Sequence, residues 1–238
     1  MKTSIKLLCL LAIVTLTGML SVNTLLLQQF DKIDWSNPYQ NFTVKPLPPL
    51  RHVRISGTPD FEIKLERSAS AQALLDPDLS GHIFKTTQRG DTLLVTFTTK
   101  GDGWDGPIDS ELIYNPLGLV LHLPELSSLY ANNVRVTVSG FDTPQLSLTA
   151  HHARLLTEKM RVTGTLAVQT ENHGFALIRA DTCGTLRATL RDSSSMNLSD
   201  VRPAHLITRV APRAELRLRG QQLGVIEPSA TIAKVTRQ

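Results

Sequence analysis

The sequence predicts an all-β fold, a parallel β-helix-like solenoid whose rungs are about twenty residues long. A leucine recurs every twenty residues, at Leu126, Leu146, Leu166, Leu186 and Leu206. This period is too long for a helix or a strand and matches one coil of a repeat. Within the coils apolar and polar residues alternate, as at Val134, Val136 and Val138, which indicates strands with one buried face. The rungs are therefore expected to be strands that stack on their neighbours.

The composition fits one domain with a narrow, layered core. The chain has 238 residues, of which 41% are hydrophobic but only 5% are aromatic, so the core is expected to consist of Leu, Val, Ile and Ala. The two cysteines are Cys9 and Cys183. Because Cys9 lies in the apolar N-terminal run, no disulfide framework is possible within the folded domain.

The N-terminal segment Leu7–Leu27 contains no charged residue and follows Lys2 and Lys6. About twenty apolar residues cross a bilayer, and the preceding lysines predict a cytoplasmic N-terminus with the rest of the chain outside. We favour an uncleaved signal-anchor. A secreted protein released by signal cleavage remains the alternative, although the segment has no good small-x-small cleavage site.

Four regions follow along the chain. Residues 1–28 are the predicted anchor, and residues 29–49 form a linker whose prolines favour extended conformations. Residues 50–226 are the predicted solenoid domain. Residues 227–238 are a tail that we expect to cap the exposed strand edges of the last rung and to keep the domain monomeric.

The first half of the domain also reads as β structure. Short strand candidates lie at residues 53–56, 61–65, 83–87, 93–98 and 119–123. Turn-forming residues separate these strands. The tripeptide Arg89-Gly90-Asp91 stands between two of the strands and is interpreted as a hairpin turn rather than as an adhesive motif.

With both halves in view, the chain resembles the head GIN domain family, auto-transporter-adhesin-like domains of unknown function found mostly in bacterial envelope proteins. The similarity covers about residues 47–226. It is carried by the opening strands Val53–Gly57 and Asp60–Ile63, by the strand entry Gly90–Leu93, and by the step Leu121–Leu129 into the repeats. The resemblance implies a right-handed parallel β-helix-like domain on the cell envelope and brings no catalytic residues with it.

Charge and motifs exclude several functions. The formal net charge is +4, but the basic residues are scattered singly along strands rather than clustered with stacking aromatics, which disfavours nucleic-acid binding. The sequence has no phosphate-binding loop, no Gly-x-Ser-x-Gly elbow and no His-Glu-x-x-His helix. We therefore expect no cofactor.

The turns of the repeat hold the candidate metal ligands. A twenty-residue period brings His151, His152, Glu171 and His173 onto adjacent rungs, and imidazole and carboxylate groups suit zinc. The favoured interpretation is a column of polar turns without metal. The loop Lys100–Glu111, with four carboxylates among three glycines, fits no known calcium motif and is interpreted as a solvated loop.

Two classes of function remain. The favoured one is a non-enzymatic, membrane-tethered envelope module with a binding, adhesion or structural role. It would bind a surface protein or a polysaccharide, or assemble with its own copies. The alternative is an enzyme acting on envelope polysaccharide, because Asp181 and Asp200 fall in one column of adjacent rungs and paired carboxylates about 5 Å apart are typical of retaining glycosidases.

Overall fold

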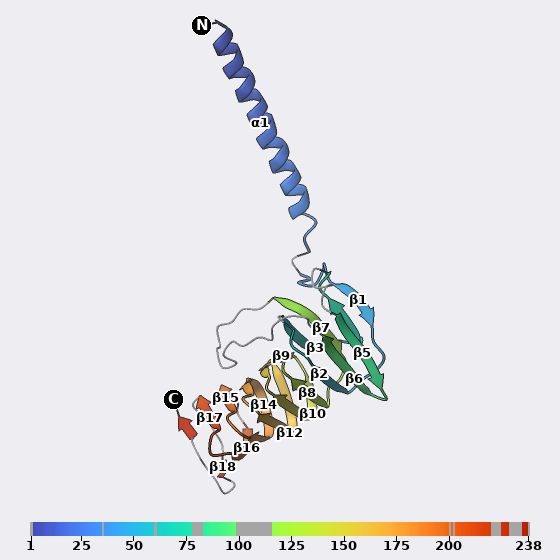
Figure 1. The fold of residues 1–238 in the computed structure, drawn as a ribbon, viewed down its shortest axis with the longest axis vertical. Helices are drawn as coiled ribbons and strands as arrows, with labels where there is room; N and C mark the ends of the chain where they lie inside the picture. The colour runs from blue at the N-terminus through green and yellow to red at the C-terminus, as the bar shows by residue number, and fades with distance from the viewer. Residues whose placement is uncertain are drawn as a thin grey trace. The chain divides into compact units, whose positions relative to one another are not determined.

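The computed structural model describes residues 2–34, 36–59, 61–77, 83–98, 116–199, 201, 203–219, 225–228 and 235–237. The chain divides into two compact units, Met1–Asn41 and Phe42–Gln238. Figure 1 shows a long helix in the first unit and β strands in the second.

The first unit contains helix α1 (Lys2–Phe30). Its segment Ile5–Phe30 has 26 residues and a mean hydropathy of 2.2, so it is long and apolar enough to cross a membrane. Hydroxyl groups within it donate to backbone carbonyls one turn earlier, as from Thr17 to Ile13 O at 2.8 Å, which satisfies these polar groups inside the helix. A helix with these properties can be a membrane anchor or a signal sequence.

The described part of the second unit forms two sheets. The ten-stranded sheet contains, in spatial order, β1 (Thr43–Pro46), β4 (Gln72–Leu75), β7 (Leu117–Leu123), β3 (Glu62–Arg67), β9 (Arg135–Ser139), β11 (Arg154–Glu158), β13 (Phe175–Ile178), β15 (Ser195–Ser199), β17 (Glu215–Arg219) and β19 (Val235–Arg237). The nine-stranded sheet contains β18 (Val225–Pro228), β16 (Pro203–Val210), β14 (Ala180–Leu190), β12 (Met160–Glu171), β10 (Asp142–His151), β8 (Ser128–Asn132), β2 (His52–Ser56), β6 (Thr92–Thr98) and β5 (Ile83–Arg89).

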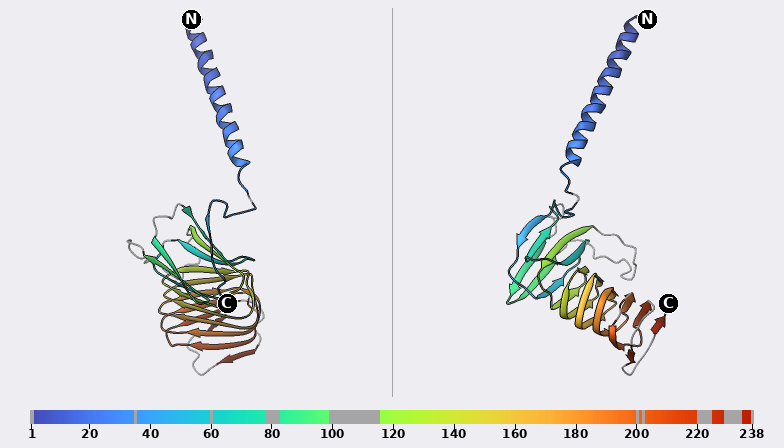
Figure 2. Two further views of the ribbon diagram at one scale, coloured as in Figure 1. Left: turned by 90° about the vertical axis from the view of Figure 1, so that its right-hand side faces the viewer. Right: turned by 180° about the vertical axis from the view of Figure 1, so that it is seen from behind.

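From β8 onward, consecutive strands alternate between the two sheets. Each strand therefore pairs in parallel with the strand two places later in the chain, as β10 does with β12 and β12 with β14. The repeating leucines are partners in this pairing: Leu146 lies opposite Leu166, Leu166 opposite Leu186, and Leu186 opposite Leu206. The twenty-residue register is therefore confirmed for these four leucines. Figure 2 shows the strands of the second unit stacked in this way.

The predicted fold class, a right-handed parallel β-helix-like solenoid over residues 50–226, is wrong. Both sheets are mixed, because β4 pairs antiparallel with β1 and with β7, and β5 pairs antiparallel with β6. The repeat that suggested uniform rungs begins only near Leu126. In the earlier half, the chain reverses at Gly90, whose φ of 62° suits a tight hairpin. Strands β5 and β6 therefore pair antiparallel instead of advancing by one coil.

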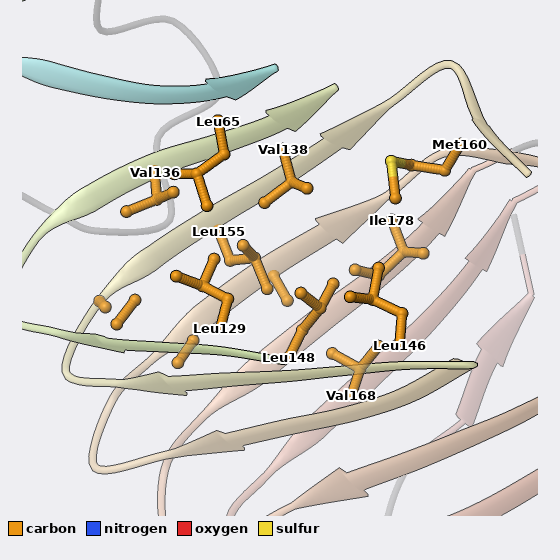
Figure 3. Close-up of a cluster of buried hydrophobic side chains, with 14 of the residues drawn as sticks. Leu65, Leu129, Val136, Val138, Leu146, Leu148, Leu155, Met160, Val168 and Ile178 are labelled. Atoms are coloured by element: carbon orange, nitrogen blue, oxygen red, sulfur yellow. The ribbon is translucent and has the colours of Figure 1, made fainter. Parts of the chain in front are cut away.

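The core lies between the two sheets and consists mainly of aliphatic side chains, as Figure 3 shows for Leu65, Val136, Leu148 and Val168 among others. Aromatic residues enter it mainly in the earlier half, where the Phe61 and Phe97 rings meet edge to face with centroids 5.3 Å apart.

Cys183 is also part of the core. Burial raises the pKa of its thiol to about 11, so the thiol stays protonated at neutral pH and is a poor nucleophile. Cys183 therefore acts as a small apolar side chain of the core.

The ends of the second unit carry short strands. Strand β1 lies within the region interpreted as a linker, and its residues are exposed. At the other end, β18 pairs with β16 and β19 pairs with β17, both in parallel. The boundaries at residues 28, 49 and 226 stay predictions.

Glycines permit a close approach of strands where the nine-stranded sheet is irregular. The register shifts between Thr143 and Gln145 in β10 and between Val162 and Thr165 in β12. A Cβ atom on Gly184 would lie 2.5 Å from Thr163 O and 2.6 Å from Gly164 O, closer than real side chains come. Only glycine fits there. Thr143 and Gln145, on either side of the first irregularity, line the groove described below.

Candidate functional site

A column of left-handed residues turns the chain from one sheet to the other. Asn133, His152, Asn172 and Asp192 have φ values of 57°, 45°, 51° and 55°. Among non-glycine residues, Asn, Asp and His are the types enriched in this conformation. The left-handed backbone conformation therefore explains why a histidine stands at position 152. A search of the sequence for metal ligands does not take this explanation into account.

The four candidate metal ligands make separate contacts. His151 Nδ1 is 2.9 Å from Asn132 Oδ1, whereas the Glu171 carboxylate accepts from Gln169 at 3.3 Å and faces Arg191 at 3.7 Å. The His152 and His173 rings meet edge to face with centroids 6.5 Å apart. Within the described ranges, no three His, Cys, Asp or Glu side chains are grouped so as to hold a metal ion.

A small cavity beside His152 is unsuited to a cation. Its volume is about 20 Å³, enough for roughly one water molecule. Its lining includes Arg135 and Arg154. Two positively charged residues beside the cavity disfavour a metal cation there.

The alternative catalytic pair cannot be placed. Asp200 lies outside the described residues, and only the backbone of Asp181 is described, in β14. The loop Lys100–Glu111 also lies outside the described residues.

The structure brings together a serine, a histidine and an aspartate that the sequence analysis did not connect. Ser128 Oγ is 2.7 Å from His52 Nδ1, and Asp91 Oδ2 is 3.4 Å from His52 Nε2. The three residues lie at one end of the neighbouring strands β8, β2 and β6. His52 and Ser128 are separated by 76 residues, which is not a multiple of the repeat length. No periodic pattern in the sequence therefore predicts their contact.

This arrangement has the residue types of a hydrolase triad, but the two backbone N–H groups at its serine already have a partner. A nucleophilic serine needs N–H donors aimed at the oxyanion that forms during the reaction. The N–H groups of Ser127 and Ser128 both donate to Arg51 O, at 2.7 Å and 3.3 Å, so neither is available. What the arrangement offers is a half-exposed hydroxyl and imidazole that can hydrogen bond to a ligand.

The outer face of the nine-stranded sheet carries two rows of side chains that cross six neighbouring strands, β2, β8, β10, β12, β14 and β16. The first row contains Arg54, Tyr130, Thr149, Gln169, Thr189 and Arg209. The second row contains His52, Ser128, Ser147, Ala167, Arg187 and Ile207. We call the two rows together the polar track. The register that aligns the core leucines also predicts the part of the track formed by β10 to β16, because outward residues share that twenty-residue spacing.

A groove adjoins the polar track. Its volume is about 670 Å³, within the range of ligand sites. Ser147, Thr165 and Ala167 of the sheet line one part of it, and Arg51 and Arg67 line another.

Glu125 also lines the groove and pairs with Arg51, with Arg51 Nε 3.0 Å from its carboxylate. Both side chains are more than half exposed, so this ion pair contributes little to stability. It leaves both groups accessible to a ligand.

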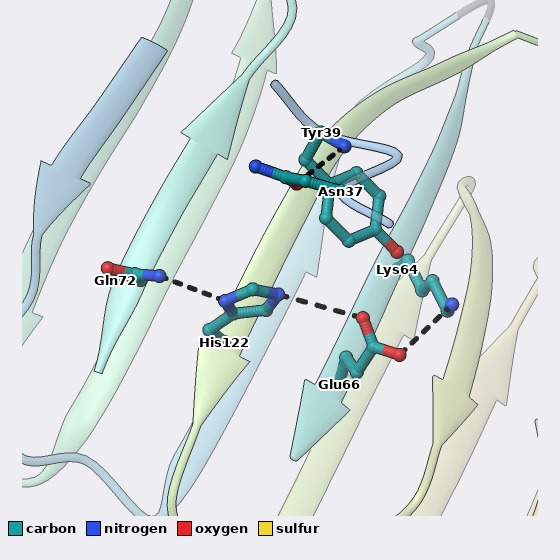
Figure 4. A network of polar contacts seen from close by, with 6 residues as sticks. All are labelled: Asn37, Tyr39, Lys64, Glu66, Gln72 and His122. Carbon is teal, nitrogen blue, oxygen red and sulfur yellow. Dashed lines mark hydrogen bonds and ion pairs between the residues drawn. The ribbon is translucent and has the colours of Figure 1, made fainter. Parts of the chain in front are cut away.

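The ten-stranded sheet carries a second polar network, drawn in Figure 4. Gln72 Nε2 lies 3.0 Å from His122 Nδ1, and His122 Nε2 lies 3.6 Å from the Glu66 carboxylate, whose other oxygen is 3.3 Å from Lys64 Nζ. Because each of these four side chains already has a partner, we interpret the network as structural. Figure 4 also includes a contact of the first unit, in which the Tyr39 N–H donates to Asn37 Oδ1 at 3.0 Å.

The fold is shared with a solved bacterial protein. A protein from Bacteroides fragilis described as a putative adhesin superposes with a TM-score of 0.53 at 9% identity, over 82% of this chain and 94% of that one. The likeness shows a common fold. A protein from Parabacteroides distasonis described as a putative lipid binding protein gives a TM-score of 0.42 at 12% identity, over 83% of this chain and 93% of that one.

No family model matches the chain, and neither does any curated protein. The resemblance to the head GIN domain family therefore extends only to a fold shared with a protein described as a putative adhesin.

Proposed function

We propose that the protein is a non-enzymatic envelope module that is anchored by α1 and binds a surface molecule through the polar track. The observation that carries this proposal is the track itself, which presents hydroxyl, amide and guanidinium groups at regular spacing across six strands. The adjoining groove of about 670 Å³ adds a concave edge to this surface. The fold shared with a protein described as a putative adhesin supports the same role.

Binding is tested with the full chain held in detergent or lipid nanodiscs. Protein, polysaccharide and lipid fractions of the producing cells' envelope are titrated separately against the immobilised chain. We expect saturable binding of one fraction, reversed by excess soluble chain. If no fraction binds saturably, the proposed function is wrong.

A serine-reactive probe tests the absence of catalysis. We expect a fluorophosphonate to leave Ser128 unmodified, because the N–H groups of Ser127 and Ser128 are both engaged by Arg51 O. The measurement is peptide mass mapping of the native chain, with Ser128→Ala as the matched control. A Ser128 adduct that forms in the native chain but not after denaturation would contradict the proposal, as would glycan turnover abolished by Asp181→Asn.

The anchor is tested by the mature N-terminus. We expect the mature chain to begin at or near Met1 and to stay with membranes through a high-salt wash, because the apolar segment Ile5–Phe30 contains no good cleavage site. Peptide mass mapping of the membrane fraction gives the answer. A mature N-terminus between residues 18 and 30 would show that α1 is a signal sequence.

A further inference from the structure

We infer that the surface molecule is an extended anionic polysaccharide that lies across the strands along the polar track. This inference rests on the proposed function and names the ligand class of the same surface.

The spacing of the track suits a polymer. Neighbouring strands lie about 4.8 Å apart, so the five steps from Arg54 to Arg209 cover roughly 24 Å. Side chains of the same row therefore recur at nearly the length of one sugar unit in an extended chain. A surface of this length contacts several units of a polymer better than it encloses one small molecule.

The charge of the track is positive. Arg187 and Arg209 are exposed and form no ion pair with any side chain that the structure describes. The described carboxylates of the six strands, Asp142 and Glu171, stand at strand ends and face Arg161 at 3.9 Å and Arg191 at 3.7 Å. The guanidinium groups of Arg187 and Arg209 are thus available to an anionic ligand, and planar guanidinium matches carboxylate and sulfate in a two-point contact.

The remaining side chains favour a polysaccharide over a nucleic acid. Ser147, Thr149 and Thr189 supply hydroxyl groups that can pair with sugar hydroxyls. Single-stranded nucleic acids are held by exposed aromatic faces on which bases stack. Tyr130, the aromatic residue of the track, already carries the Arg54 guanidinium 4.4 Å from its ring centre, so that face is not open to a base.

The test uses the full chain in detergent and two matched pairs of polymers. Polygalacturonate is compared with its methyl-esterified form, and dextran sulfate with dextran, by titration calorimetry. We expect the charged member of at least one pair to bind and its neutral counterpart not to bind. Raising ionic strength from about 0.1 M to about 1 M shortens the Debye length from about 10 Å to about 3 Å and should weaken that binding.

Paired variants locate the site. The double variant Arg187→Ala/Arg209→Ala should lose at least about tenfold in affinity, because each arginine contributes charge-assisted hydrogen bonds. The double variant Arg179→Ala/Arg213→Ala removes the same charge from two exposed residues outside the track and should bind nearly as well as the native chain.

Several outcomes overturn the inference. These are equal binding of neutral and charged polymers, equal losses in the two double variants, tighter binding of single-stranded DNA, or no binding of either charged polymer. If an envelope fraction binds but neither charged polymer does, the proposed function stands and the inferred ligand class is wrong. If the track variant keeps full binding of the envelope fraction, the protein still binds a surface molecule, but the polar track is not its site.

Discussion

Leu166→Ala should lower the free energy of unfolding by about 2 to 5 kcal/mol, the range for a buried leucine in a packed core. Leu166 is only 1% exposed and lies between Leu146 and Leu186 on the two neighbouring strands. The truncation would leave a cavity with packed neighbours on both sides, and the surrounding strands are held in register by their ladders, so they cannot close it fully. A urea melt followed by far-UV circular dichroism measures the loss.

Thr165→Ala is the matched control for this change. Thr165 precedes Leu166 in β12, is partly exposed and faces the groove rather than the core. We expect its substitution to change stability by less than about 1 kcal/mol. Equal effects of the two substitutions would mean that the assignment of inner and outer residues in β12 is wrong.

Deletion of residues 221–238 should convert the protein into concentration-dependent oligomers. The strands at this end, β18 and β19, have only four and three residues, and short edge strands are one way in which proteins avoid edge-to-edge pairing. Their removal would expose β16, with eight residues, and β17, with five. Longer unpaired edges present more backbone N–H and C=O groups to a second copy.

Light scattering over a range of concentrations measures the association. Deletion of residues 229–238 is a shorter truncation for comparison, because it removes β19 while β18 remains paired with β16. It should associate less than the longer deletion. A chain that lacks residues 221–238 but stays monomeric and equally stable would show that β18 and β19 contribute nothing to the end of the sheets.

The parts of the fold that the sequence predicts are those governed by local periodicity. The pairing of Leu146, Leu166 and Leu186 follows from their spacing, and the hairpin at Arg89-Gly90-Asp91 follows from turn chemistry. The pairing of β2 with β8 does not follow from either, because it joins segments that share no repeat. The mixed character of the sheets, which makes the solenoid prediction wrong, originates in this earlier half.

The candidate site divides in the same way. The outward residues Thr149, Gln169 and Thr189 share the spacing of the leucines and are predictable from it. The contact of His52 with Ser128 depends on the long-range pairing of β2 with β8, which no local signal specifies. The histidines at the turns illustrate a further limit: a residue type that suits metal also suits a left-handed corner, and sequence alone does not separate these two explanations.

The left-handed corners at Asn133, His152, Asn172 and Asp192 also restrict how the length of this protein can change in evolution. An insertion of one residue between two corners would turn the following side chains to the opposite face, exposing leucines and burying arginines. A whole unit of about twenty residues, the spacing of the corners, can be gained or lost without that exchange. Each such unit would lengthen the track by one strand, about 4.8 Å, so homologues that differ by whole units would differ in the length of polymer they can contact while keeping the chemistry of each contact.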